Sequence, residues 1–366
     1  MRAEAVVDLS AIKHNVARLK EKAGADLLAV VKADAYGHGL VRVAQTALDA
    51  GASMLGVALL EEAVTLREAG ITAPILAWLV QPGSDYKSAI ELNIDLAAGS
   101  LKALHEIQAA SKDKQARVHL ELDTGMTRGG FLSEWSQITA ADVAGLEIVG
   151  LFSHFARADE PLENQNKEQL ARFKKEIATL NELGFTNAIH HLSNSAATLT
   201  NHSAALDMVR TGIAIYGLTP DVSMGSSKEF NLRPAMQLRA ALYLVKDVPA
   251  GTPVGYGASE STTRDTKLGV VAMGYADGIP RIAKNAGVWI NGKRAPIIGR
   301  VSMDQFVVDL GPESKANSGD WVVVFGNGSH GEYTADDWGA ASGSINYEIV
   351  TRIGPRVPRI YSAHIY

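Results

Sequence analysis

Short apolar runs alternate with longer amphipathic stretches through the first 210 residues of the chain. One amphipathic stretch follows the cap-like Asp8-Leu9-Ser10 and a charged one covers Glu163–Leu183, and both predict helices. Strands that alternate with helices form either a closed (β/α)₈ barrel or an open doubly wound sheet, and the number of runs favours the barrel. The expected strands are Leu27–Val31, Met54–Val57, Pro74–Leu79, Ile94–Ala97, Val118–Leu122, Leu146–Phe152, Ala188–Leu192 and Leu206–Val209.

The pattern changes after about Gly217, where a stretch rich in glycine, serine and proline predicts a loop. Short alternating segments separated by glycine follow, and only Ala335–Ser342 has a helical pattern. The chain is therefore expected to be an α/β protein with an N-terminal (β/α)₈ barrel over residues 1–230 and a mainly-β domain over residues 231–366. The strands expected in the second domain are Ala240–Val245, Val270–Met273, Val288–Ile290, Gln305–Leu310 and Trp321–Phe325.

Composition narrows the possible functions of the chain. Hydrophobic residues make up 46% and charged residues 20% of 366 residues, which excludes a disordered protein. A net charge of -5 provides no basic surface for nucleic acid, and no apolar run is long enough to span a membrane. The N-terminus lacks a secretion signal, so we expect a cytoplasmic protein. Cysteine is absent and the histidines show no zinc-binding spacing, so we expect no disulfide, no thiol nucleophile and no metal.

Polar residues follow several of the expected strands, at the barrel end where catalytic groups gather. Lys32 follows the first strand, where burial would make it a nucleophile or base, although a lysine there can also extend into solvent. Arg128 stands between glycines after the fifth strand and is either a carboxylate clamp or a surface arginine. His154 follows the sixth strand and is either a general base, a residue that orients one, or a structural histidine.

The turns after the seventh and eighth strands match the usual phosphate site of such barrels. Asn194 or Ser195 is expected to cap a helix, and the first amides of a helix attract anions. Gly212 would let backbone N–H groups approach a phosphate closely. Capping alone explains the serine equally well.

Together these motifs resemble those of bacterial alanine racemase, a family that depends on pyridoxal 5'-phosphate (PLP). The most specific motif is Val30–Gly39, which is similar to the segment that carries the cofactor lysine in that family. The resemblance extends over nearly the whole chain. The supporting motifs are Asp123–Arg128, Ser153–Ala156, Asn194–Ala197, Arg210–Leu218, Val254–Gly257, Gly274–Gly278, Gly299–Gln305 and Ile345–Glu348.

The resemblance implies a head-to-tail homodimer with shared active sites that interconverts L-alanine and D-alanine and supplies D-alanine for peptidoglycan. Lys32 would carry PLP as a Schiff base, Arg210 would face its pyridine nitrogen, and Tyr256 of the partner subunit would be the second base. Arg128 and the backbone of the partner's Met303 would bind the substrate carboxylate, and Tyr275 would line the entrance. The phosphate would be held by Tyr36, Ser195, Gly212, Ile213 and Tyr347.

This set of residues agrees with the chemistry of racemisation. The α-proton of an amino acid is too weakly acidic to be removed unaided, and PLP acts as an electron sink. Two bases on opposite faces of Cα can remove and return the proton without moving the substrate. Lysine and tyrosine both need a lowered pKa to work near neutrality. His154 coupled to Arg210 could provide the cationic charge that lowers the pKa of Tyr256.

Position 121 departs from the family pattern. Many members carry a lysine there, often carbamylated, whose negative charge steadies the arginine that binds the carboxylate, whereas this chain has Glu121. Strand alternation places His119, Glu121 and Asp123 on one face, and we expect Glu121 to be inside the barrel with Arg128 as its partner. The alternative is another partner or a protonated carboxyl group.

Two other functions are alternatives to the racemase. A PLP-dependent amino-acid decarboxylase has a similar architecture, but Val254–Gly257 and Ser302–Gln305 are racemase-like and the cysteine common in decarboxylases is missing. A PLP-carrier protein without catalytic activity would resemble the barrel alone. The second domain, which carries Tyr256 and Met303, is therefore the feature that favours the racemase.

Overall fold

The computed structural model describes residues 1–363. These residues form two compact units. The barrel unit comprises Ile12–Ala35 and Leu40–Leu232, and the β unit comprises Met1–Ala11, Tyr36–Gly39 and the described residues from Arg233 onward. Within residues 1–363, no helix combines the length and the apolar character needed to cross a membrane.

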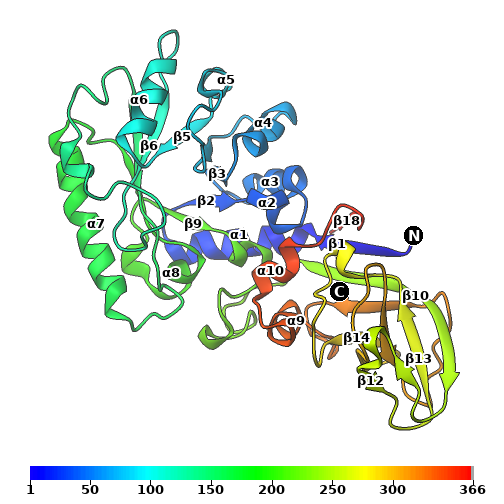
Figure 1. Cartoon of the computed structure of the whole chain (residues 1–366). Coiled ribbons are helices and arrows are strands. Elements are labelled where there is room, and N and C mark those ends of the chain that lie inside the picture. Colours follow the sequence, from blue (N-terminus) through cyan, green and yellow to red (C-terminus); the bar gives the residue numbers. More distant parts are fainter. Residues whose placement is uncertain (364–366) are drawn as a thin grey trace. The chain divides into compact units, whose positions relative to one another are not determined.

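Eight parallel strands form the centre of the barrel unit (Figure 1). They pair in the order β8-β7-β6-β5-β4-β3-β2-β9. Hydrogen bonds from Asp207 N to His190 O (3.2 Å) and from Arg210 N to Ser193 O (2.8 Å) join the two ends of this order. The predicted barrel and all eight of its predicted strands are confirmed. The strands are β2 (Asp26–Val30), β3 (Met54–Val57), β4 (Ile75–Ala77), β5 (Asp95–Ala98), β6 (Arg117–Glu121), β7 (Glu147–Phe152), β8 (Ile189–His191) and β9 (Met208–Thr211).

Helices lie outside these strands (Figure 1). The two helices expected from the sequence are present, and Asp8 Oδ1 caps the first by accepting from Ser10 N (2.8 Å) and Ala11 N (3.1 Å). Apolar side chains fill the space between helices and strands, as in Leu27, Leu55 and Phe173, all of which are fully buried. The helices are α1 (Leu9–Ala23), α3 (Leu40–Asp49), α4 (Leu60–Glu68), α5 (Tyr86–Glu91), α6 (Leu101–Ala110), α7 (Asn164–Glu182) and α8 (Ser195–Thr200), with short 3₁₀ turns η1 (Trp135–Gln137), η2 (His202–Ala204), η3 (Ile213–Tyr216) and η4 (Val222–Met224).

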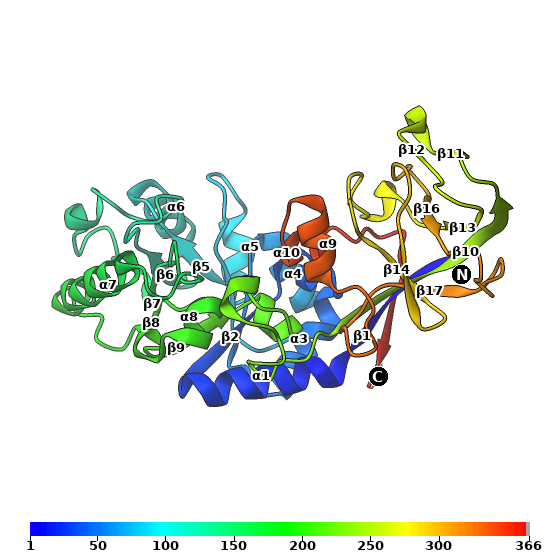
Figure 2. The same cartoon turned by 90° about the horizontal axis from the view of Figure 1, so that it is seen from below.

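The β unit is built on a mixed sheet, as the alternating pattern of the second half of the chain predicts (Figure 2). All five strands expected there are present, and α9 has the predicted bounds. The strands are β10 (Met236–Val248), β11 (Pro253–Val254), β12 (Glu260–Ser261), β13 (Thr266–Val271), β14 (Gly287–Ile290), β15 (Lys293–Pro296), β16 (Phe306–Asp309), β17 (Trp321–Phe325) and β18 (Arg359–Ser362), with α9 (Ala335–Ser342), α10 (Asn346–Thr351) and the turns η5 (Tyr256–Ala258) and η6 (Tyr275–Asp277).

The sequence pattern did not reveal β1 (Ala3–Asp8), which belongs to the sheet of the β unit. β1 pairs antiparallel with β10, with Ala3 opposite Ala240, and parallel with β18, with Ala5 opposite Arg359. All six of its residues are buried, so they show no polar alternation. The partners of β1 lie more than two hundred positions away in the chain, and local periodicity carries no record of such pairing.

Candidate active site

Lys32 directly follows the first barrel strand, as predicted, and begins a left-handed turn, α2 (Lys32–Tyr36). Ala33, Asp34, Ala35 and Tyr36 have φ between 52° and 54°, and the amide of Ala35 donates to Val31 O at 2.8 Å. This conformation costs roughly 1–2 kcal/mol for each residue with a Cβ. Strain of this kind is kept where the surrounding structure enforces it, commonly at functional sites.

A carboxylate that the sequence analysis missed holds this turn. Glu62 Oε1 accepts from the backbone N–H of Ala33 at 2.5 Å. Its other oxygen, Oε2, accepts from Ala58 N at 3.0 Å and from Leu59 N at 3.1 Å, so one side chain ties the turn to the start of α4. In the sequence Glu62 is an ordinary acid in the first turn of a helix, and no local signal distinguishes it.

The ammonium group of Lys32 lies beside an aromatic ring and other cations. Lys32 Nζ is 5.8 Å from the centre of the Trp78 ring. Burial lowers the pKa of Lys32, repulsion from Arg128 lowers it further, and Glu62 opposes the shift. A lysine with a lowered pKa can act as a base or nucleophile near neutrality.

Arg128 is exposed in the loop after β6. The carboxylate of Asp123 organises this loop, because Oδ1 accepts from the backbone N–H groups of Gly125 (2.8 Å), Met126 (3.1 Å) and Thr127 (3.0 Å). Within the described part of the chain, Arg128 has no hydrogen bond or ion pair. Its guanidinium group is therefore available to an anionic ligand.

Arg210, in β9, is buried and almost fully hydrogen-bonded. Its Nη1 donates to His191 O (2.6 Å) and His191 Nδ1 (3.2 Å). Its Nη2 contacts Ser153 O (2.5 Å), His154 Nδ1 (3.2 Å) and Leu192 O (3.4 Å). Among the residues that the structure describes, none accepts a hydrogen bond from Nε. Burial lowers the pKa of Arg210 to about 10, so the group remains cationic at neutral pH.

His154 is coupled to Arg210, and it is neutral. Arginine can only donate, so Nδ1 of His154 must be unprotonated and its Nε2 must carry the hydrogen. Burial, followed by repulsion from Arg210, Arg128 and Lys32, lowers the pKa of His154 well below 6.5. The positive charge that the sequence analysis attributed to this coupled pair therefore resides on Arg210 alone.

The turns after β8 and β9 meet at the hydroxyl group of Ser195. Ser195 Oγ accepts from Gly212 N at 2.9 Å and from Ala214 N at 3.3 Å. Asn194 caps α8, since its side chain accepts from Ala197 N at 3.1 Å. Capping therefore does not explain Ser195, whose hydroxyl group lies among backbone amides of η3, which begins at Ile213. The hydroxyl hydrogen of Ser195 is not used in these contacts and can be donated to a phosphate oxygen.

Glu121 does not form the ion pair with Arg128 that we expected. Along residues 1–363, no ion pair or hydrogen bond joins Glu121 to Arg128, which acts on it only through its charge. Burial raises the pKa of Glu121, and Arg210 opposes this shift more strongly than Arg128 does. The lateral space is limited, because Cβ atoms built at Gly99 and Gly129 would lie 3.4 and 3.3 Å from Glu121 Oε2. Glu121 thus lies in the field of both arginines, and Arg210 is its main cation.

The β unit gathers two other residues assigned to the phosphate. The rings of Tyr36 and Tyr347 are tilted by 45° with centres 6.1 Å apart. Burial raises the pKa of Tyr36, so its hydroxyl group stays protonated and can donate to an anion.

Tyr275 and Met303 also lie together in the β unit. The amide of Tyr275 donates to Ser302 O at 3.1 Å and that of Ala276 donates to Met303 O at 2.9 Å. A Cβ at Gly274 would lie 2.3 Å from Met303 O, so only glycine permits this approach. Tyr275 and Met303 themselves are 38% and 54% exposed.

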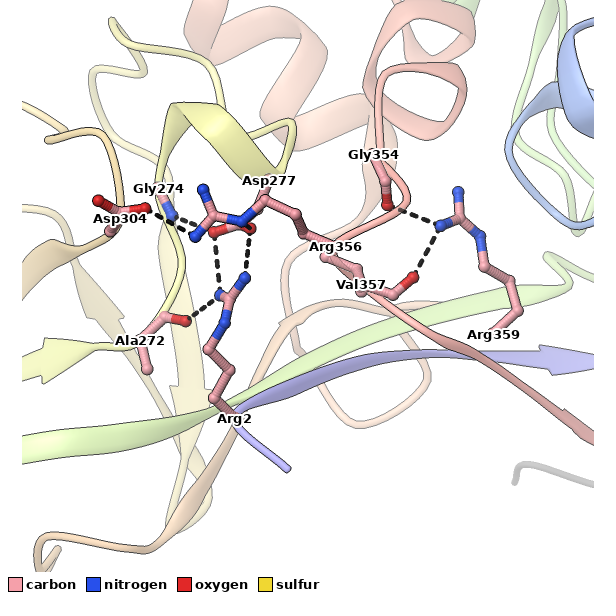
Figure 3. Close-up of polar contacts among 9 residues, drawn as sticks. All are labelled: Arg2, Ala272, Gly274, Asp277, Asp304, Gly354, Arg356, Val357 and Arg359. Atoms are coloured by element: carbon pink, nitrogen blue, oxygen red, sulfur yellow. Dashed lines mark hydrogen bonds and ion pairs between the residues drawn. The ribbon is translucent and has the colours of Figure 1, made fainter.

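A buried carboxylate stabilises these two segments (Figure 3). Asp277, at the end of η6, receives two hydrogen bonds from Arg2, at 2.5 and 3.0 Å, and one from Gly274 N at 3.0 Å. Arg356 lies 3.2 Å from the same carboxylate and 2.7 Å from Asp304, the residue after Met303. The cluster therefore links the turn that carries Tyr275 to the loop that carries Met303 (Figure 3).

Tyr256 lies at the start of η5, between β11 and β12, and is 70% exposed. Its two neighbours, Gly255 and Gly257, have φ of 71° and 77°, a region that favours glycine. A Cβ at Gly255 would lie 3.4 Å from Arg300 N, so the turn packs on the segment that leads to Met303. The two residues that the sequence analysis assigned to the partner's site, Tyr256 and Met303, thus occupy neighbouring loops of one unit.

The donor set of the barrel unit fits PLP. Lys32, Arg128 and Arg210 are three cations, and each of them lowers the pKa of His154. Arg128 also lowers the pKa of Lys32 and of Arg210. Glu121 is the acid whose negative charge offsets part of this positive charge. An excess of positive charge favours a ligand with anionic groups, such as a phosphate and a carboxylate. The remaining donor of Arg210, Nε, suits the acceptor nitrogen of a pyridine ring.

Family models match both halves of the chain. The alanine racemase N-terminal domain matches residues 7–220, and the alanine racemase C-terminal domain matches residues 235–361. The alanine racemase of Salinispora arenicola is 49% identical, and the alignment covers 98% of each chain. That of Frankia casuarinae is 47% identical over 99% of this chain and 96% of the relative.

Solved structures agree with these matches. The alanine racemase of Streptomyces lavendulae superposes with a TM-score of 0.97 and 44% identity, covering 100% of this chain and 98% of the other. That of Bacillus anthracis with bound L-Ala-P gives 0.91 and 37% identity, covering 99% and 95%. These likenesses extend over both units and do not favour the decarboxylase. The chain belongs to the alanine racemase family, the isomerases that interconvert L-alanine and D-alanine.

Proposed function

We propose that this chain racemises alanine with PLP as its cofactor and with Lys32 and Tyr256 as its two bases. The observation that carries the proposal is the cationic cluster of Lys32, Arg128 and Arg210 beside neutral His154. When bound, PLP supplies an electron sink for the charge left on Cα after the α-proton departs.

The cofactor and the substrate would be held by the following residues. Lys32 Nζ would bind PLP covalently, and Arg210 Nε would donate to its ring nitrogen. Arg128 and the backbone of the partner's Met303 would bind the carboxylate of alanine, and Tyr275 would line the entrance to the site. The phosphate would be held by Tyr36, Ser195, Gly212, Ile213 and Tyr347.

Each base would move the α-proton on one face of the substrate. Lys32 Nζ would take the proton of D-alanine, and the lowered pKa of Lys32 suits this task. The phenolic oxygen of Tyr256 would take that of L-alanine. The Nε2–H of His154 would face Tyr256, and the charge of Arg210 behind it would favour the phenolate. Arg210 stays cationic, so the ring nitrogen that it faces would remain unprotonated. This would limit side reactions at Cα.

We further propose a head-to-tail homodimer in which residues 1–230 form the PLP-binding domain and residues 231–366 complete the partner's site. The exposure of Tyr256 and Met303, at 70% and 54%, supports this arrangement, because groups used in catalysis are rarely left in open solvent. By analogy with the family, the product D-alanine would serve peptidoglycan synthesis in the cytoplasm.

A chiral screen of amino acids tests the activity. The purified protein should convert L-alanine and D-alanine into each other without releasing CO₂, whereas CO₂ release would indicate the decarboxylase. Borohydride reduction followed by peptide mapping should place the PLP label on Lys32, and a label on another lysine would refute that assignment.

A mixing experiment tests the shared site. Lys32→Ala and Tyr256→Phe subunits are each expected to be inactive, and their hybrids should regain part of the activity because one of the two sites is wholly native. Stable hybrids without activity would contradict the shared site.

A further inference from the structure

A line of buried polar side chains runs through the barrel unit to Arg210. His191 Nδ1 lies 3.2 Å from Arg210 Nη1, and His191 Nε2 lies 2.9 Å from His119 Nδ1. His119 Nε2 lies 3.5 Å from Asp95 Oδ2. Asp95, His119 and His191 are all 0–1% exposed, and none of them is among the residues assigned to cofactor or substrate.

The line has a single direction of donation, which Arg210 sets. Arginine has no acceptor, so His191 must accept at Nδ1 and carry its hydrogen on Nε2. His191 Nε2–H then donates to His119 Nδ1, and the hydrogen of His119 must be on Nε2, facing Asp95. Both histidines are thereby fixed as neutral Nε2–H tautomers.

The other end of the line is a stable anion. Asp95 accepts from Arg117 at 2.8 and 3.4 Å, and Arg117 also pairs with Glu147 at 3.1 Å. Burial opposes ionisation of Asp95, but the hydrogen bonds from His119 and Arg117 outweigh it and lower its pKa. Burial and repulsion from Arg210 lower the pKa of His191 well below 6.5. Asp95 and His191 thus have the charges that the direction of donation requires.

The barrel is shaped to accommodate these rings. Gly150 in β7 is opposite His119, and a Cβ there would lie 2.0 Å from His119 Nδ1. The ring of Phe152 stacks on His191 at 5.1 Å and 9°, and its centre is 5.3 Å from Arg210 Cζ. Gly150 therefore leaves room for the ring of His119, and the stacked ring of Phe152 leaves His191 little freedom to rotate.

We propose that Asp95, His119 and His191 are positioning residues that fix the orientation of Arg210, so that its Nη atoms are occupied and its Nε is presented to the ligand. The last step, in which Nε meets a pyridine nitrogen, rests on the proposed function. The order of the hydrogen bonds does not. A buried network whose members are all satisfied rigidifies a site, whereas a broken one leaves costly unpaired groups.

The first test is nitrogen NMR of the PLP-loaded full-length protein with ¹⁵N-labelled histidine. His119 and His191 should both show the shifts of neutral imidazoles protonated at Nε2. A histidine at either position that is cationic, or protonated at Nδ1, would overturn the proposal whatever the activity of the protein. This readout needs no variant that might fail to fold.

The second test measures how the PLP-stripped full-length protein binds 4'-deoxypyridoxine 5'-phosphate, an analogue that cannot react with Lys32. His119→Leu removes the acceptor of His191 and should weaken binding by up to about tenfold, the effect of losing one hydrogen bond between neutral groups. His119→Gln keeps an acceptor and a donor and should restore most of the affinity. His190→Gln is the matched control, because His190 is on the same strand as His191 but pairs with Asp207 at 2.9 Å.

The outcomes separate the two proposals. If His119→Leu lowers the thermal midpoint but leaves analogue binding unchanged, the line of buried side chains has only a structural role and the inference fails. If His190→Gln weakens binding as much as His119→Leu does, the inference also fails. If the tautomers and the binding series are as expected but alanine is not racemised, the proposed function fails and the positioning role stands.

Discussion

Replacing Asp277 with asparagine should destabilise the β unit and weaken substrate binding. Asp277→Asn keeps the shape of the side chain and one acceptor oxygen but removes the charge that faces Arg2 and Arg356. The side chain of Asp277 is 0% exposed, so water cannot reach this position and solvate the arginine groups that lose their anionic partner. The turn that carries Tyr275 should then be less firmly joined to the loop that carries Met303.

The size of the effect follows from the contacts of Asp277. A hydrogen bond to a charged group contributes about 1.5–3 kcal/mol, and Asp277 has such bonds with Arg2. The arginine side chains are 37% and 44% exposed, so solvent screens part of this energy. Arg2 keeps Ala272 O at 2.7 Å and Arg356 keeps Asp304 at 2.7 Å. We therefore expect a loss of about 2 kcal/mol in the free energy of unfolding, or about 4–8 °C in the thermal midpoint.

Thermal unfolding of the PLP-loaded protein measures the loss, and initial rates measure the consequence for the site. Under the proposed function Tyr275 and Met303 would act in binding, so the KM for alanine should rise while kcat changes little. Arg18→Gln is a suitable control, since its partner Glu21 is 74% exposed and that ion pair should contribute less than about 0.5 kcal/mol. A midpoint for Asp277→Asn that is no lower than that of the control would refute the reasoning.

Three further results are expected. Glu121→Gln should raise the KM for alanine, because the site loses the acid that opposes Arg128 and Arg210, and bicarbonate should not activate the wild type; an unchanged KM or strong activation in initial-rate assays would contradict this. Tyr256→Phe should abolish racemisation yet retain PLP, and should slow α-deuterium exchange of L-alanine far more than of D-alanine; equal slowing would argue against two separate bases. The free energy of unfolding should fall as the pH drops below 6.5. The pKa values of His154 and His191 are lowered in the folded protein, so these histidines bind protons only after the chain unfolds. Each histidine contributes a slope of up to about 1.4 kcal/mol per pH unit, and His154→Gln should reduce the slope measured in denaturant titrations.

The barrel could be predicted because its information is local. Each strand is a short apolar run and each helix an amphipathic stretch, so periodicity alone locates them. The candidate residues were also accessible, since Lys32, Arg128, His154 and Arg210 follow or end strands on the side where barrels place catalytic groups. The resemblance to alanine racemases added roles that no periodicity could provide.

Other features depend on contacts between distant parts of the chain. Nothing near Ala3–Asp8 indicates its pairing with β10 and β18, and nothing near Glu62 indicates that it holds the turn after Lys32. The absence of an ion pair between Glu121 and Arg128 depends on side-chain reach, which strand alternation does not specify.

The buried line from Asp95 to Arg210 shows the same limit. Alternation places His119 on the inner face of its strand, but a strand pattern does not say which inward residue of another strand it meets. Only the closed barrel brings β5, β6, β8 and β9 around one interior, where Gly150 leaves room for His119 to reach His191. The sequence by itself therefore determined most of the elements and the chemical groups. The tertiary structure alone decided their hydrogen-bond partners, because low-dielectric burial requires every polar group to find a partner among whichever residues the fold brings near.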